Sequence, residues 1–354
     1  MAEKVLMKGN EAIAEAAILA GCRHYFGYPI TPQTEIAAYM AKRMPKIGGT
    51  FLQAESEIAA INMVYGVSSA GKRVMTSSSS PGISLKGEGI SYLAGADLPA
   101  LVVNCQRGGP GLGGIQPSQS DYFQATRGGG HGDYHMIVLA PDSVQEMAQL
   151  TIKGFELADE YRMTSMILAD GTIGQMMEPV SFDFEIKEAP EKPWATTGTG
   201  MKRPHNIINS LYLKPEKLEE TNIARYEKYA VVEEKEALAE EYMMDGAEIV
   251  LAAFGIAARV TKNAVKAARA EGIKAGLIRP VTLWPFPKAY FEKALGTAKE
   301  MISVELSMGQ MIEDVRLATQ CRIPVSLTKR VGGMIPSVEE VLCAIRKAAE
   351  RIGD

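Results

Sequence analysis

The first 178 residues alternate between short apolar blocks and segments with helical periodicity. Six apolar blocks are expected to form strands, at residues 24–28, 50–53, 73–76, 100–104, 136–140 and 165–169. Segments with a period near 3.6 residues separate several of them, including 57–67 and 143–161. This alternation is typical of parallel sheets with helical crossovers, so the pattern predicts an α/β fold.

Two helix starts can be predicted from local signals. Asn10 is expected to cap an alanine-rich helix that ends near Gly21. The Thr31-Pro32 pair is expected to open a second helix, because proline is well suited to the first helical position.

The pattern changes after Gly174 and then resumes. Residues 179–213 are polar and rich in helix breakers, and the charged segment 214–242 is compatible with a solvated bridging helix. Strand-like blocks return at 248–254, 275–279, 301–305 and 324–327. We therefore expect one α/β domain at 1–178, a connector at 179–245 and a second α/β domain at 246–354.

Composition excludes several classes of function. The 354 residues carry a net charge of -4, so no basic surface is available for nucleic acid. The segment Met1 to Lys4 lacks the apolar stretch of a signal peptide, and the longest apolar run, 249–258, is too short to span a bilayer. We expect a cytoplasmic protein that binds neither nucleic acid nor membrane.

The cysteines give no sign of a metal or iron-sulfur site. Four of them, far apart in sequence, form no C-x-x-C pair: Cys22, Cys105, Cys321 and Cys343. Buried reduced thiols are the expected state. The four histidines also lack metal-ligand spacing, and His131 and His135 are expected to make structural hydrogen bonds rather than transfer protons.

One glycine-rich segment matches the dinucleotide-binding fingerprint in spacing. Gly109, Gly111 and Gly114 follow an expected strand, as they would in a nicotinamide enzyme. However, Ile115, Gln116 and Pro117 follow where the fingerprint needs the start of a helix. A flexible loop over a site is the favoured interpretation.

Glu57 stands at the expected start of a helix. Carboxylates are common at helix starts, so a capping role is the alternative to any catalytic one. Yet Glu57 lies nine residues before Gly66 in EIAAINMVYG. This segment resembles the helix that carries the cofactor-activating glutamate in the pyrimidine-binding domains of thiamine enzymes.

Three further motifs extend the resemblance. They are Gly27-Tyr-Pro-Ile-Thr-Pro32, Thr76-Ser-Ser-Ser-Ser-Pro-Gly82 and Asn104-Cys-Gln-Arg-Gly-Gly-Pro110. Together they are similar to the turns and the arginine loop of 2-oxoacid:ferredoxin oxidoreductases, with Ser80 in place of the usual glycine. Segments 247–255, 279–280 and 305–310 resemble the second domain of that family. The resemblance covers nearly the whole chain and implies a pyrimidine-type thiamine-diphosphate-binding parallel-sheet domain followed by a transketolase C-terminal-like α/β domain.

The resemblance also implies roles for individual residues. Glu57 is the expected catalytic residue, through a hydrogen bond to the aminopyrimidine N1', and Pro29, Thr31 and Ser80 are expected to bind the cofactor with it. Arg107 is expected to bind the substrate carboxylate, with Thr31 and Gln116 beside it. Apolar neighbours would favour a protonated Glu57 and the helix start would favour the carboxylate; the sequence leaves that balance open.

The implied reaction is oxidative decarboxylation of a 2-oxoacid with coenzyme A, which gives acyl-CoA, carbon dioxide and reduced ferredoxin. Residues 113–122 and 128–134 are most similar to the 2-oxoisovalerate (branched-chain) group. Relatives specific for 2-oxoglutarate carry a lysine where alignment places Gln116. A 2-oxoglutarate- or pyruvate-specific relative, and a non-catalytic assembly subunit of the same fold, are the alternatives.

Missing motifs predict partner subunits. No G-D-G motif for the magnesium-bound diphosphate occurs in the chain, so Mg²⁺ and half of the thiamine diphosphate site are expected on a partner subunit. Without cysteine clusters, iron-sulfur centres are expected on a ferredoxin-like subunit. A gamma-type subunit, the electron acceptor ferredoxin and a dimer of heteromers complete the expected assembly.

Overall fold

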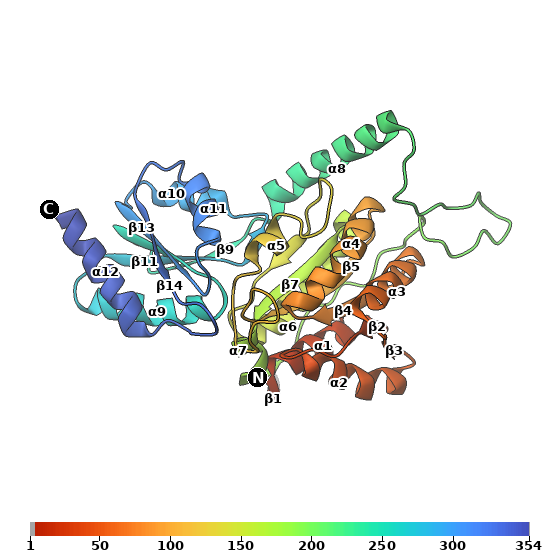
Figure 1. Ribbon diagram of the computed structural model, residues 1–354, viewed down its shortest axis with the longest axis horizontal. Helices are drawn as coiled ribbons and strands as arrows, with labels where there is room; N and C mark the ends of the chain where they lie inside the picture. The colour runs from red at the N-terminus through yellow and green to blue at the C-terminus, as the bar shows by residue number, and fades with distance from the viewer. Residues whose placement is uncertain (1–3, 354) are drawn as a thin grey trace.

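The computed structural model describes residues 4–353 and has two α/β units joined by an extended connector and a long helix (Figure 1). The expectation about the first residues, Met1 to Glu3, lies outside the described part. Within residues 4–353, no helix combines the length and apolar character needed to cross a bilayer.

The first sheet has seven strands in the spatial order β12-β6-β7-β5-β4-β2-β3, and all neighbours are parallel except β12 and β6. Their bounds are β2 His24–Gly27, β3 Thr50–Gln53, β4 Val74–Ser78, β5 Ala100–Gln106, β6 Ile137–Leu139, β7 Thr164–Asp170 and β12 Thr282–Trp284. These confirm the six expected strands. The chain moves from β2 outward to β3 and then back to β4, so the sheet reverses its winding between β2 and β4, where open α/β sheets form ligand crevices.

The helices of this unit cover the parallel strands (Figure 1). Their bounds are α1 Gly9–Leu19, α2 Thr34–Arg43, α3 Glu57–Ser69, α4 Ser80–Gly95, α5 Tyr122–Thr126, α6 Val144–Tyr161 and α7 Gly171–Gln175, with a 3₁₀ turn at Met44–Ile47. Helices α3 and α4 pack together, as do α1 and α6. Strand β1, Lys4–Lys8, pairs antiparallel with β8, Met177–Ser181, in a separate two-stranded sheet.

Both predicted helix starts were wrong by a short distance. Asn10 lies inside α1, and its buried amide donates to Pro32 O and Glu35, because that tertiary contact replaces the capping role. Helix α2 begins at Thr34 because residues 30–33 form a turn, closed by the Gln33 N–H to Ile30 O hydrogen bond.

The second sheet has the order β14-β13-β10-β11-β9, and only β9 runs antiparallel. The strands are β9 Ala239–Tyr242, β10 Ile249–Ala252, β11 Ala275–Pro280, β13 Glu300–Glu305 and β14 Val325–Lys329; the helices are α9 Gly255–Ala270, α10 Lys288–Ala294, α11 Met311–Ala318 and α12 Val338–Gly353. All four expected strands of this unit are confirmed.

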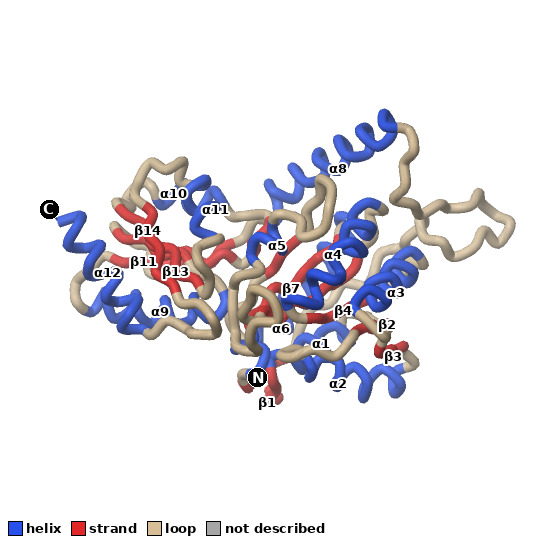
Figure 2. Tube along the Cα trace, viewed as in Figure 1, coloured by secondary structure: helices blue, strands red, loops and turns tan. Residues whose placement is uncertain are grey.

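The segment between the two units is a loop that projects from the body, followed by a bridging helix (Figures 1 and 2). The helix, α8 Pro215–Glu236, buries only Arg225, Tyr229 and Val232, as a solvated bridge should. It ends before the expected residue 242, because residues 239–242 pair with β11 as strand β9. Strand β12 comes from the second half of the chain, yet it pairs with β6 and completes the first sheet.

Candidate active site

The carboxyl ends of four neighbouring parallel strands meet at one edge of the first sheet, and each predicted site residue follows one of these ends. Pro29 and Thr31 follow β2, Glu57 follows β3, Ser80 follows β4, and Arg107 and Gln116 follow β5. The reversal between β2 and β4 lies in the middle of this row. The topology therefore places these residues where ligands bind in open α/β sheets.

Glu57 is the first residue of α3, and Ser56 caps that helix by accepting a hydrogen bond from the Ala59 N–H. Its side chain is 5% exposed, and no hydrogen bond to its carboxylate occurs among residues 4–353. A Cβ atom at Gly82 would lie only 2.6 Å from Glu57 Oε1, so the glycine is what lets α4 approach the carboxylate. Glu57 thus lies against the first turn of α4 with free hydrogen-bonding capacity.

Two hydroxyl groups beside this turn also lack partners. Ser78 Oγ and Ser79 Oγ are buried and make no hydrogen bond within the described chain. Buried polar groups are normally hydrogen-bonded. The two free hydroxyls therefore indicate that a ligand forms hydrogen bonds here. The sequence signal was the serine run 77–80, of which only Ser80 was expected to bind the cofactor.

Ser80 serves the protein itself more than an external ligand. It is the first residue of α4, after an extended Ser79, so the turn needs no glycine here. The Ser80 hydroxyl donates to Asp121 at 2.6 Å and accepts from the Arg107 N–H at 3.0 Å. Burial raises the pKa of Asp121, while the hydrogen bonds from Ser80 and Asn104 oppose that shift. Ser80 therefore joins the start of α4 to the arginine loop, a link through Asp121 that sequence reasoning missed.

Arg107 is buried at the end of β5. Its Nη1 donates to Thr31 O at 3.0 Å and its Nη2 to Leu112 O at 3.3 Å, whereas Nε has no partner among residues 4–353. Within the same residues no carboxylate lies within 4.0 Å of this guanidinium, as every ion pair found involves other side chains. A buried cation bonded only to carbonyl groups is suited to an anionic ligand.

The glycine-rich loop after Arg107 is not a dinucleotide turn, because no helix begins until Tyr122. It folds back on itself through the Gly108 N–H to Gln116 O hydrogen bond and so brings Gln116 close to Arg107. The fingerprint interpretation is excluded by this geometry.

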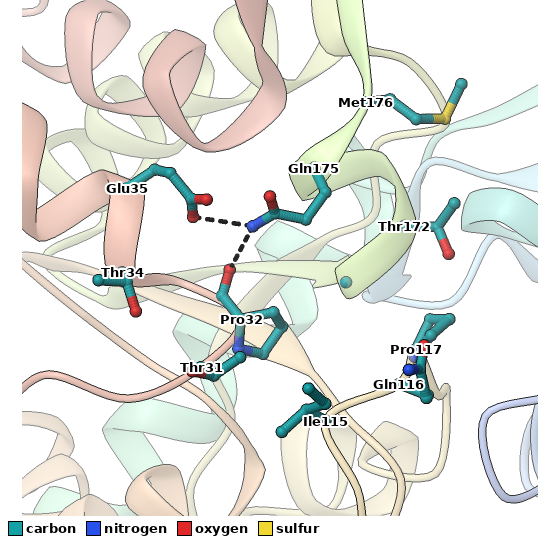
Figure 3. Close-up of a pocket in the computed structure, with 11 residues that line it drawn as sticks. Thr31, Pro32, Thr34, Glu35, Ile115, Gln116, Pro117, Thr172, Gln175 and Met176 are labelled. Atoms are coloured by element: carbon teal, nitrogen blue, oxygen red, sulfur yellow. Dashed lines mark hydrogen bonds between the residues drawn. The ribbon is translucent and has the colours of Figure 1, made fainter.

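A cavity of about 610 Å³ opens beside this loop (Figure 3). It is lined by Thr31, Pro32, Thr34, Glu35, Ile115, Gln116, Pro117, Gly171, Thr172, Gln175 and Met176. The Gln175 amide donates to Pro32 O at 3.0 Å and to Glu35 at 2.8 Å. Burial acts to raise the pKa of Glu35, but hydrogen bonds from Asn10, Gln175 and Lys8 hold it below the usual value.

The structure brings some of the predicted site residues into contact with one another and leaves others apart. Thr31 and Gln116 share the cavity, Arg107 touches Thr31, and Ser80 links Arg107 to the helix that contacts Glu57. Glu57 itself lies outside the cavity lining. Pro29 is exposed on the β2 turn.

The two histidines with an open role lie away from Glu57. His135 stacks on Trp284 with ring centroids 4.7 Å apart, and burial lowers its pKa. His131 is exposed and meets the edge of Tyr92. Among the described residues no group of three or more His, Cys, Asp or Glu side chains could hold a metal ion.

The residues present suit the pyrimidine half of thiamine diphosphate. A buried glutamate, two unpartnered serine hydroxyls and a glycine that leaves space beside them offer hydrogen bonds to an aminopyrimidine ring. No metal-ligand set that could hold the magnesium of a diphosphate appears within residues 4–353. The fold and the site together place the chain among α/β proteins that bind thiamine diphosphate.

Comparison with known proteins agrees. Residues 15–244 match the family described as pyruvate flavodoxin/ferredoxin oxidoreductase, thiamine diP-binding, and residues 247–341 match pyruvate:ferredoxin oxidoreductase core domain II. The chain is 51% identical over 350 residues to ketoisovalerate oxidoreductase subunit VorB of Methanothermobacter marburgensis, covering 99% of each chain. It is 35% identical to 2-oxoglutarate synthase subunit KorA of the same organism, covering 97% of this chain and 98% of the relative.

Solved structures extend the comparison. The 2-oxoglutarate:ferredoxin oxidoreductase from Magnetococcus marinus, with 2-oxoglutarate, coenzyme A and succinyl-CoA bound, superposes with a TM-score of 0.89 at 30% identity. The match covers 98% of this chain and 65% of that one. A split-gene transketolase, at 14% identity and a TM-score of 0.60, shares the fold alone. The chain therefore belongs to the family of 2-oxoacid:ferredoxin oxidoreductase subunits that carry a thiamine diphosphate-binding domain.

Proposed function

We propose that the chain supplies the pyrimidine half of the thiamine diphosphate site in a complex that oxidatively decarboxylates 2-oxoisovalerate with coenzyme A. The carrying observation is that the start of α4 joins Glu57 to Arg107. Gly82 contacts the glutamate, and Ser80 bonds the backbone of Arg107. Helix α4 thereby holds both Glu57, the proposed cofactor contact, and Arg107, the proposed contact to the substrate carboxylate.

Each residue then has a defined task. Glu57 would hold the aminopyrimidine ring through a hydrogen bond to N1', and Ser78 and Ser79 would offer further hydrogen bonds to the ring. Thiamine diphosphate, when bound, supplies the carbon nucleophile for decarboxylation. Arg107 binds the 2-oxoacid carboxylate, and the Thr31 backbone, already bonded to Arg107, fixes its direction. We also propose that Pro29 and Thr31, on the turn after β2, contact the cofactor.

The cavity supports an uncharged branched side chain in the substrate. Ile115 and Met176 offer apolar surface, and Gln116 carries no charge. Glu35, held ionised by its hydrogen bonds, adds a negative charge to the lining. A second substrate carboxylate would be repelled and only partly solvated, so 2-oxoglutarate should be the poorer substrate.

Partner subunits complete the proposal. We infer that a subunit with a G-D-G motif binds Mg²⁺ and the diphosphate, that ferredoxin-like and gamma-type subunits complete the complex, and that it passes electrons to ferredoxin as a cytoplasmic dimer of heteromers. We also propose that the chain consists of a domain at 1–178, a connector at 179–245 and a second domain at 246–354.

The test uses the purified complex with coenzyme A and a viologen dye as electron acceptor. We expect a higher kcat/KM for 2-oxoisovalerate than for 2-oxoglutarate or pyruvate. A preference for 2-oxoglutarate would overturn the substrate assignment, and no activity with any 2-oxoacid would overturn the enzyme assignment.

Calorimetry tests the divided site separately. Thiamine diphosphate and magnesium are titrated into the isolated chain and then into the complex. We expect micromolar or tighter binding only in the complex, because the ring alone makes few contacts to offset the freedom lost on binding. Tight stoichiometric binding to the isolated chain would contradict the divided site.

A further inference from the structure

Lys86 is a buried lysine to which no task has yet been given. It lies in the middle of α4 and is 0% exposed. Its ammonium donates to Thr76 Oγ1 at 2.8 Å and to Ser77 O at 3.0 Å, both on β4. An ammonium has three N–H donors, so the third is not used by these two bonds. A buried charge is costly unless it is compensated, so a counter-charge is expected close by.

Glu57 is the carboxylate on this side of α4 that interacts with the Lys86 charge, although the two side chains form no ion pair within 4.0 Å. Gly82 and Lys86 are four residues apart and thus on the same side of α4, and Glu57 Oε1 lies against Gly82. Burial lowers the pKa of Lys86 to about 7, and the charge of Glu57 opposes this shift.

Other ionisable groups near α4 have partners of their own. Asp121 bonds Ser80 and Asn104, and Arg107 bonds the carbonyls of Thr31 and Leu112, all at the start of the helix. The Tyr25 hydroxyl on β2 bonds Ser77 Oγ at 2.7 Å, and burial raises its pKa far above neutrality. Lys86 is therefore the cation beside Glu57 whose pKa burial brings close to neutral pH.

We propose that Lys86 is a positioning residue for Glu57, whose ammonium, anchored on β4, supplies the positive charge beside the buried carboxylate before the aminopyrimidine binds. This inference rests on the proposed function of Glu57. When Lys86 loses its proton, the carboxylate loses this nearby positive charge. The affinity of the complex for thiamine diphosphate then depends on pH through Lys86.

The test measures thiamine diphosphate affinity by calorimetry, at saturating magnesium from pH 6 to 9, in complexes carrying wild-type chain or Lys86→Met. At pH 6 we expect the variant to bind about tenfold more weakly, as for loss of one interaction with a charged group. The difference should shrink toward pH 9, where wild-type Lys86 is neutral. Equal affinities at all pH values, or a difference that does not change with pH, would overturn the proposal.

Controls separate this effect from lost folding. Lys192→Met removes another buried lysine, which pairs with Asp159 at 2.5 Å beside the connector, and it should leave the pH profile unchanged. Lys86→Gln retains hydrogen bonding to β4 without the charge and replaces the methionine variant if that does not fold. If neither folds, the wild-type profile decides: affinity that does not bend near pH 7 refutes the role of Lys86. A complex that binds no thiamine diphosphate refutes the proposed function instead.

Discussion

The two domains each hold a buried glutamate between a parallel strand and a helix, and they use it differently. Glu305, at the end of β13, is 1% exposed and accepts hydrogen bonds from two serine hydroxyls and three backbone N–H groups. Glu57, at the start of α3, is 5% exposed and accepts none within the described chain. The first carboxylate is saturated by the protein, whereas the second is not.

This difference shows that burial alone does not identify a functional carboxylate. The hydrogen bonds of Glu305 satisfy the first turn of α11, which is a structural task. Glu57 and the unpartnered Ser78 hydroxyl both lie against Gly82, and the neighbouring Ser79 hydroxyl is also unpartnered, so this turn keeps free hydrogen-bonding capacity. Free hydrogen-bonding capacity in a buried site marks the position of a ligand.

The largest expected effect is the loss of activity in Glu57→Gln. In the complete complex we expect kcat to fall by roughly 10² to 10⁴, as for removal of a positioned acid-base group, while assembly is retained. Glu55→Gln, at an exposed position two residues earlier, is the matched control. Activity of Glu57→Gln within about threefold of wild type would contradict its catalytic role.

The converse substitution, Glu305→Gln, should affect stability. An amide has one acceptor oxygen and adds donors, so several of the five hydrogen bonds are lost, at about 2 to 4 kcal/mol of unfolding free energy. Urea unfolding of the isolated chain measures this, with the exposed Glu313→Gln as control. An unchanged midpoint for Glu305→Gln would remove the contrast between the two glutamates.

Local patterns predicted the parallel strands but not how distant segments meet. Apolar runs gave all ten expected strands, and most of these are buried parallel strands with continuous hydrophobicity. Strand β12 was missed since its three residues gain their strand character only by pairing with β6. The 179–245 connector contains β9 for the same reason.

The site shows the same limit. The motifs singled out Glu57 and Arg107, and the structure places both at the edge that the carboxyl ends of the parallel strands share. Lys86 was missed because a lysine in a glycine-rich segment does not differ in sequence from a solvated one. The saturation of Ser80 by Asp121 is also a long-range contact without a local signal.

Gln116→Lys should reverse the substrate preference and thereby sharpen the assignment of the cavity. A lysine in the lining would attract the second carboxylate of 2-oxoglutarate and oppose the charge of Glu35. We expect the ratio of kcat/KM for 2-oxoglutarate to that for 2-oxoisovalerate to rise about tenfold. Leu112→Lys adds the same charge to the loop outside the cavity lining and should leave the ratio unchanged. An equal change in both variants would indicate a general effect of charge.

The smallest expected effect tests whether the second domain reaches the first domain's site. The loop after β14 brings Gly333 against Gln116, and a Cβ atom at 333 would lie 3.1 Å from Gln116 Cγ and closer still to its Cβ. Gly332, the neighbouring control, also has a positive φ but has open space around its Cβ position. Both alanine variants strain the backbone, yet only Gly333→Ala should displace Gln116.

We expect Gly333→Ala to raise KM for 2-oxoisovalerate about threefold to tenfold, with little change in kcat, because the collision disturbs binding of the substrate side chain more than the reacting centre. Steady-state kinetics of the complex with each variant measures this. The double variant Gln116→Gly with Gly333→Ala removes the colliding side chain, so the effect of the alanine should become as small as in Gly332→Ala. Equal kinetics for the two single alanine variants would mean that the second domain does not control Gln116, and the difference between the domains would then end at their two glutamates.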